Sequence, residues 1–176
     1  MANDVGVSVK TLSEWLNVLE ASFIIFRLPC FFENFGKRLV KTPKLYFTEV
    51  GLASWLLGIT DVKQLSSHPL IGNLFENMVV LEALKQRFNS GKENDLYFFR
   101  DQRGFEIDLL LTDGNKIIPY EIKSAQTYTP DFAKNLKTFA QRSENIESGY
   151  VVYAGDLERS GQPALINFKN LANSLD

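Results

Sequence analysis

The sequence predicts an α/β fold whose core runs helix, three strands, helix, strand. Three observations predict it. Residues 70–88 carry an apolar stripe with helical spacing. Residues 105–111 and 116–123 each alternate between two sets of side chains, and the turn-forming Asp113-Gly114-Asn115 separates them, which is typical of a β-hairpin. A second helical pattern at 130–142 precedes an apolar strand at 149–154.

The composition is that of a globular protein without disulfides or membrane spans. The chain has 176 residues, of which 45% are hydrophobic, enough for one domain or a domain plus a small appendage. A single cysteine, Cys30, excludes an internal disulfide, and no segment approaches the roughly 20 apolar residues of a membrane span. We therefore expect a cytoplasmic protein with no membrane partner. The formal net charge of −2 excludes a global basic field, so any contact with nucleic acid must be local.

Residues 1–60 predict a truncated winged-helix-like segment. Ser8 is a candidate N-cap for a helix with apolar residues at helical spacing, and a loop at 34–41 joins two strands as a wing would. Only five residues precede Gly6, too few for the first helix of a helix-turn-helix. The alternative is a plain helix and hairpin packed on the main domain. The predicted elements are a helix at 9–19 and strands at 23–28 and 44–47.

Four cations stand close together in this segment with no intervening acid: Lys37, Arg38, Lys41 and Lys44. They are the best local candidates for contacts with DNA phosphates. The alternative is a solvated basic loop.

A polar connector at 61–67 divides the chain into the N-terminal segment, residues 1–60, and a main domain, residues 61–176. A short apolar helix at 49–57 precedes the connector, and Gly58 ends it. The remaining predicted elements are a strand at 96–100, a strand at 164–168 and a short helix within 169–176.

The long helix at 70–88 carries one acid in an unusual place. Glu76 has Val79, Val80 and Ala83 as its neighbours on the helical wheel. An acid on a largely apolar flank needs a partner or a metal.

The hairpin brings two acids and a lysine to one face. Alternation puts Ile107 and Leu109 on one face of the first strand and Asp108 on the other, while Glu121 and Lys123 share a face of the second strand. A two-residue loop of Gly114-Asn115 sets Asp108 opposite Glu121, and a loop of Asp113-Gly114 shifts it by one pleat. Either even-length loop keeps all three polar side chains together, whereas an odd loop would put Asp108 among apolar residues.

Two carboxylates on one sheet face can hold a hard divalent cation such as Mg²⁺ or Mn²⁺. A neighbouring lysine could orient or help deprotonate a water and offset charge growing on a phosphate, so the set suits phosphodiester hydrolysis. The alternative is a solvated polar face in which Asp108 pairs with a lysine or arginine. Against this alternative, aspartate is a poor strand former.

The spacing of Asp108, Glu121 and Lys123, with the order of elements, is similar to the PD-(D/E)XK nuclease superfamily and its restriction-endonuclease-like αβββαβ core. The resemblance implies that Asp108 and Glu121 are metal ligands, that Lys123 is the water-orienting base and that Glu76 is an additional acid. It also implies a place near substrate for Gln126.

A closer resemblance covers nearly the whole chain. It rests on residues 44–52 and 72–77 together with Glu106-Ile107-Asp108 and Glu121-Ile122-Lys123. These look like the C-terminal domain of unknown function of a family of prokaryotic AAA+ ATPases, in which an ATPase module and a winged helix precede a nuclease-like domain. The implied partner is thus an upstream ATPase module in the same polypeptide. This chain has no GxxxxGK[ST] motif, so we expect no ATP site in it.

Three functions remain open at this point. The first is a metal-dependent nuclease-like domain acting on DNA, which the intact acid, acid, lysine set favours. The second is a catalytically silent module that recognises nucleic acid or protein and regulates the ATPase, which the lack of a basic surface favours. The third is a structural scaffold for ATPase oligomers, with the chain as part of a homo-oligomer.

Overall fold

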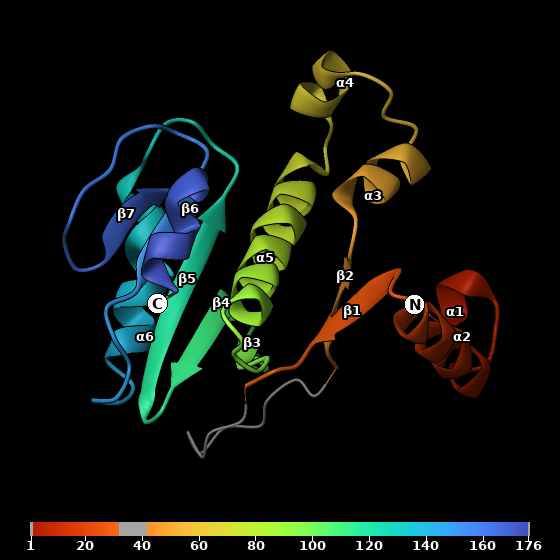
Figure 1. Ribbon diagram of the computed structural model, residues 1–176, viewed down its shortest axis with the longest axis horizontal. Helices are drawn as coiled ribbons and strands as arrows, with labels where there is room; N and C mark the ends of the chain where they lie inside the picture. Colours follow the sequence, from red (N-terminus) through yellow and green to blue (C-terminus); the bar gives the residue numbers. More distant parts are fainter. Residues whose placement is uncertain (1, 32–41, 176) are drawn as a thin grey trace.

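The computed structural model describes residues 2–31 and 42–175 and has the α/β architecture that the sequence predicts (Figure 1). A five-stranded mixed sheet, with strand order β3-β4-β5-β6-β7, forms the main body, and β1 and β2 form a separate two-stranded sheet. Within the described residues, no helix is both long and apolar enough to cross a membrane. Lys37, Arg38 and Lys41 lie outside the described residues.

The described residues up to Phe47 contain two helices and a strand pair. The side chain of Ser8 accepts a hydrogen bond from the backbone N–H of Thr11, which confirms the predicted N-cap. The residues before Gly6 form one short helix that the pattern did not predict. The strands pair antiparallel. The elements are α1 (Ala2–Val5), α2 (Val9–Ala21), β1 (Ile25–Leu28) and β2 (Lys44–Phe47).

Two short helices lead into the main body. The predicted apolar helix is α3 (Val50–Leu56). The predicted connector is instead a helix, α4 (Val62–Ser67), because Asp61 caps it. The Asp61 carboxylate accepts hydrogen bonds from the backbone N–H groups of Lys63 and Gln64, at 2.8 and 2.9 Å, and so satisfies donors of the first turn.

The main body follows the predicted order of helix, three strands, helix and strand. Asp113 pairs with Lys116, which confirms Gly114-Asn115 as the hairpin loop. The chain crosses through α6 to β6, which is parallel to β5, and β7 is parallel to β6. The elements are α5 (Ile71–Asn89), β3 (Leu96–Arg100), β4 (Glu106–Asp113), β5 (Lys116–Lys123), η1 (Pro130–Ala133), α6 (Lys134–Ala140), β6 (Tyr150–Tyr153), β7 (Ala164–Asn167) and η2 (Phe168–Ser174).

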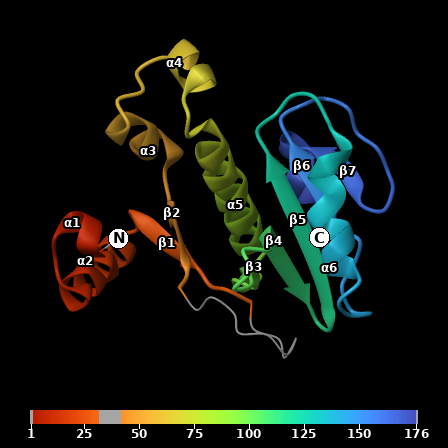
Figure 2. The same cartoon turned by 180° about the vertical axis from the view of Figure 1, so that it is seen from behind.

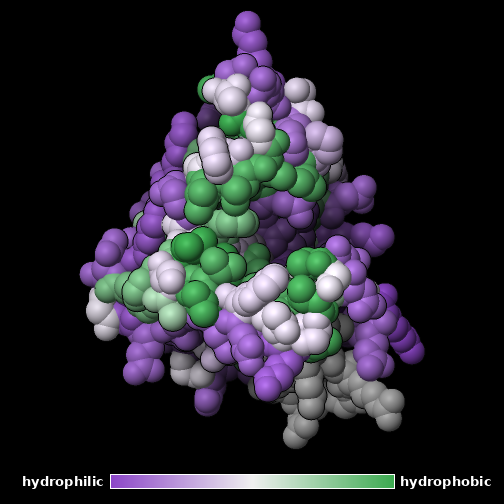
Figure 3. Space-filling view, turned by 90° about the vertical axis from the view of Figure 1, so that its right-hand side faces the viewer, coloured by the Kyte–Doolittle hydropathy of each residue, from purple (hydrophilic) through white to green (hydrophobic). Residues whose placement is uncertain are grey.

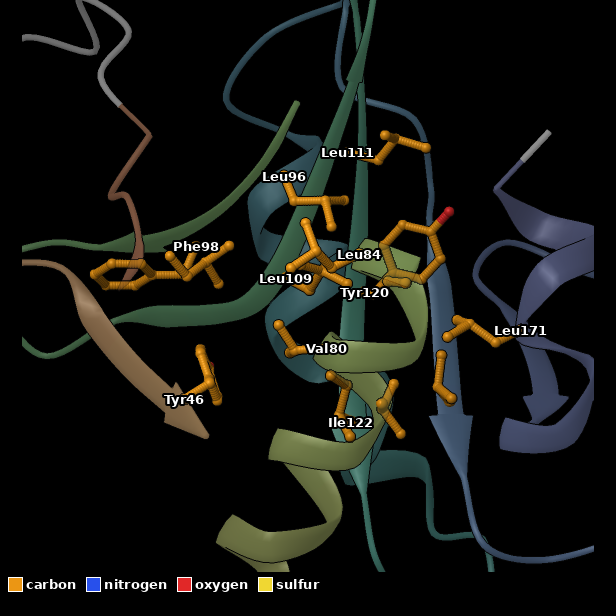
Figure 4. Close-up of a cluster of buried hydrophobic side chains, with 14 of the residues drawn as sticks. Tyr46, Val80, Leu84, Leu96, Phe98, Leu109, Leu111, Tyr120, Ile122 and Leu171 are labelled. Carbon is orange, nitrogen blue, oxygen red and sulfur yellow. The ribbon is translucent and has the colours of Figure 1, made fainter. Parts of the chain in front are cut away.

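Two hydrophobic cores lie on opposite faces of the five-stranded sheet. Helix α5 covers one face, where Val80 packs with Tyr120 and Ile122 (Figure 4). Helix α6 covers the other face, where Leu136 packs with Val151. In Figure 1, α5 lies nearer the viewer than the sheet. In Figure 2, seen from the opposite side, α6 lies nearer the viewer. Since both faces are covered, a polar side chain on either face needs a partner.

Strand β4 carries a β-bulge beside Asp108. Its register against β3 shifts by one residue between Tyr97 and Phe99, because β4 has one additional residue there. Ile107 consequently belongs to the α6 core and Leu109 to the α5 core. The prediction that these two residues share a face was therefore wrong. Bulges of this kind redirect side chains next to functional sites.

Candidate active site

Asp108, Glu121 and Lys123 converge on the α6 side of the hairpin. The Lys123 Nζ atom lies 3.2 Å from Asp108 Oδ2 and 2.6 Å from Glu121 Oε2. Asp108 Oδ2 also accepts a hydrogen bond from the backbone N–H of Ile122 at 2.9 Å. The bulge and the hairpin register thus bring both carboxylates within reach of one cation, which in this arrangement is the lysine ammonium.

Burial and neighbouring charges shift the pKa values of Glu121 and Lys123. Glu121 is only 2% exposed. Burial, followed by the negative charge of Asp108, raises the pKa of Glu121 to about 7. Burial alone would lower the pKa of Lys123, but the charges of Asp108 and Glu121 outweigh it and raise that pKa. Lys123 is therefore an ammonium at neutral pH, and its single positive charge is shared by the two carboxylates.

Asn135 of α6 supports the set from the opposite layer. Its Nδ2 atom donates to the backbone oxygen of Glu106 at 3.2 Å and to Glu121 Oε1 at 3.4 Å. One amide thus ties α6 to both strands of the hairpin. The sequence offers no signal that separates Asn135 from a solvent-facing asparagine on this helix.

Glu76 does not join Asp108 and Glu121. Its Oε1 atom accepts hydrogen bonds from Lys44 Nζ at 2.7 Å and from the Tyr46 hydroxyl at 2.6 Å. Across the described part of the chain, no group of three or more Asp, Glu, His or Cys side chains is arranged to hold a metal ion. The structure therefore brings together three of the four predicted site residues and leaves the fourth with partners from β2.

Lys44 forms a second ionic cluster around Glu76. Its Nζ atom also lies 2.5 Å from Glu106 Oε1, and Glu106 pairs in turn with Arg100. Burial raises the pKa of the Tyr46 hydroxyl, and the charges of Glu76, Asp108 and Glu106 raise it further. Lys44, proposed from the sequence to contact DNA, has a side chain only 14% exposed and is neutralised by these acids.

A pocket of about 540 Å³ opens beside this second cluster. Its polar end is formed by Lys44, Glu76, Arg100 and Glu106, and its apolar wall by leucines of α3 and α5. Gln126 lies elsewhere, in the exposed loop that follows β5. That loop lies against residue 155, since a Cβ added to Gly155 would stand 2.1 Å from the Gln126 backbone oxygen.

Comparisons with known proteins give a family but no activity. The pattern of a domain of unknown function, DUF4143, matches residues 71–171, and that of another, DUF8612, matches residues 1–63. Uncharacterised proteins of Mycobacterium bovis and Mycobacterium tuberculosis are each 31% identical to this chain over 138 residues. Those residues make up 78% of this chain and 30% of each relative, so the chain spans less than a third of their length. No solved structure matches the chain significantly.

The DUF4143 match covers more than half of the chain and includes Glu76, Asp108, Glu121 and Lys123. The expected likeness to a domain of unknown function is thereby confirmed. This chain belongs to the DUF4143 family.

Proposed function

We propose that residues 61–176 form a metal-dependent nuclease-like domain with a restriction-endonuclease-like, PD-(D/E)XK core, which hydrolyses DNA phosphodiesters. One observation carries the proposal: a single cation, the Lys123 ammonium, already contacts both Asp108 and Glu121. The order α5, β3, β4, β5, α6, β6 supports it, since it is the αβββαβ order of that superfamily's core.

Asp108 and Glu121 would hold Mg²⁺ or Mn²⁺. Two carboxylates are the oxygen donors these ions prefer, and a buried pair with a raised Glu121 pKa favours an additional positive charge. The metal would supply an acidified water and would polarise the phosphate. Because its pKa is raised, Lys123 is better suited to orient water and offset phosphate charge than to accept a proton.

We propose that this domain acts as the C-terminal part of a cytoplasmic AAA+ ATPase, in which residues 1–60 are winged-helix-like and contact DNA. The greater length of the mycobacterial relatives supports a larger polypeptide. The basic residues Lys37, Arg38 and Lys41 and the exposed Gln126 are the proposed DNA contacts.

Cleavage of DNA tests this function. We expect the chain to cut branched or linear DNA in the presence of Mg²⁺ or Mn²⁺, and Asp108→Ala to cut at least about 1000-fold more slowly because metal stabilisation worth several kcal/mol is lost. Asp113→Ala is the matched control, since it removes an exposed acid from the turn of the same hairpin and should cut normally. Equal cleavage by Asp108→Ala and the unmodified chain would count against the proposal.

Recognition without turnover is the second candidate. The net charge of −2 and the neutralisation of Lys44 by Glu76 and Glu106 favour it, because both weaken the attraction for a DNA backbone. If the chain shifts the mobility of DNA at low salt but leaves it uncut, and if Asp108→Ala binds equally well, this second function is the correct one.

A further inference from the structure

Two asparagines, Asn73 and Asn77, lie one turn apart on the same face of α5. The Asn77 amide pairs with the backbone of Phe47, the last residue of β2. Its oxygen accepts from the Phe47 N–H group and its nitrogen donates to the Phe47 carbonyl oxygen, each at 2.8 Å. Asn77 thus takes the place of a neighbouring strand at that point of β2. The Asn73 side chain is exposed and forms no hydrogen bond with any other described residue.

The pocket of about 540 Å³ lies beside Asn73, at the end of β2. Phe47 and Asn73 both line it, and its apolar wall includes Leu57, at the end of α3, and Leu70, at the start of α5. Its volume falls in the range of roughly 300–1,000 Å³ that is typical of ligand pockets. The pocket therefore combines the Asn73 amide, which can donate and accept, with a surface for apolar side chains.

The apolar wall of the pocket continues onto the surface of the molecule. Leu57 and Leu70 are 40% and 42% exposed, and Trp55 and Leu56 of α3 are exposed still further. Figure 3 shows apolar side chains gathered around α3. Exposed apolar patches beside a pocket are typical of surfaces that bind another protein.

The charged end of the pocket carries no net charge. Two acids and two cations form an unbroken chain of ion pairs there, in the order Glu76, Lys44, Glu106 and Arg100. Because each of these groups already has a partner of opposite charge, the pocket has no excess charge to attract an anion or a cation. A charged ligand would lose its hydration without a compensating ion pair, so an uncharged ligand fits best.

We propose that the pocket between α3 and α5 binds an extended, uncharged segment of a partner protein. Each residue of an extended backbone presents an N–H group and a carbonyl oxygen, and the Asn73 amide would pair with both as Asn77 pairs with Phe47. Leucine-like side chains of the segment would pack against Leu57 and Leu70. Neither Asn73 nor these leucines belongs to the proposed metal site, so the two proposals can be tested separately.

A nuclear magnetic resonance titration with the acetylated and amidated peptide Leu-Ala-Leu tests the proposal. This peptide is uncharged and too short to form a stable helix. We expect it to shift the side-chain amide signal of Asn73 and the backbone amide signal of Leu57 until both signals saturate. The same peptide with glutamate in place of both leucines should produce no saturable shift, because its charges find no free partner in the pocket.

Two variants with matched controls test the residues that carry the proposal. Asn73→Ala should bind the peptide about tenfold more weakly, because both hydrogen bonds to its backbone are lost. Asn89→Ala removes an exposed asparagine from the other end of α5 and should bind normally. Leu57→Glu should abolish binding by placing a charge in the apolar wall, whereas Leu157→Glu alters an exposed leucine outside the pocket and should not. All four positions are exposed, and the spectrum of each variant also reports whether it is folded.

The outcomes separate this proposal from its alternatives. Saturable shifts of Asn73 and Leu57 that weaken in Asn73→Ala but not in Asn89→Ala would support it. Absence of a saturable shift at millimolar peptide, or equal binding by folded Asn73→Ala, would overturn it. If the same signals shift when the chain is concentrated without peptide, a second copy fills the pocket and the proposal is wrong. Mn²⁺ binding and DNA cleavage are measured independently of all these results.

Discussion

Replacing Lys123 by methionine is expected to lower the free energy of unfolding of the metal-free protein by about 2 kcal/mol, because two largely buried carboxylates lose the cation they share. The Lys123 side chain is 32% exposed and those of Asp108 and Glu121 only 15% and 3% exposed. Mn²⁺ should then stabilise the variant more than it stabilises the unmodified chain, since a divalent ion takes the place of the missing charge. Urea denaturation with and without Mn²⁺ measures both effects.

Lys116→Met provides the control for this experiment. Lys116 lies on the same strand and pairs with Glu147 at 3.0 Å, but the two side chains are 67% and 46% exposed. Its removal should change the free energy of unfolding by less than about 0.5 kcal/mol and should leave the response to Mn²⁺ unchanged. Equal losses in the two variants would mean that the Lys123 contacts contribute no more than a surface ion pair.

Glu121→Gln is expected to have the opposite effect on the metal-free protein and to stabilise it by about 1–2 kcal/mol at pH 8. Burial and the charge of Asp108 raise the pKa of Glu121 from 4.5 to about 7. Between these values the folded state keeps a proton that the unfolded state has lost, so the contribution of Glu121 to stability falls as pH rises from 4.5 to 7. The glutamine variant has no carboxyl group to deprotonate at this position, so its stability does not fall for this reason.

The pH dependence of the stability gained by Glu121→Gln identifies its cause. Near pH 4 the Glu121 carboxyl is protonated in both states, so the variant and the unmodified chain should have similar stability, and the difference should grow up to about pH 7. Glu147→Gln removes an exposed acid and should show no such profile. A gain from Glu121→Gln that is constant from pH 4 to pH 8 would mean that the charge of Glu121 is not its source.

The hairpin shows what sequence can predict about this protein. A period of two and a Gly-Asn turn are local properties, and together they predicted the hairpin and two possible registers, of which the structure has the one that pairs Asp113 with Lys116. The bulge beside Asp108 could not be predicted, because it depends on how β3 pairs with β4. The bulge moves Ile107 to the other face of the sheet, but Asp108 still contacts Lys123 and the backbone N–H of Ile122.

The partners of Glu76 show what the sequence could not predict. Its unusual position on α5 correctly indicated that it needs a partner, but not which one. Lys44 is 32 residues away in sequence, and its pairing with Glu76 depends on how β2 packs against α5. The contact between Asn135 and Glu121 also depends on tertiary packing, because α6 follows the hairpin in the sequence and packs across the sheet. Such long-range contacts are set by tertiary packing, which spacing along the chain does not encode.

Calorimetric titration of Mn²⁺ into the unmodified chain, Asp108→Ala and Glu121→Gln tests the central claim most directly, because the claim is that these two acids hold a divalent cation. We expect the unmodified chain to bind one Mn²⁺ and both variants to lose that binding. Absence of binding at millimolar Mn²⁺, or equal binding by all three proteins, would contradict the claim.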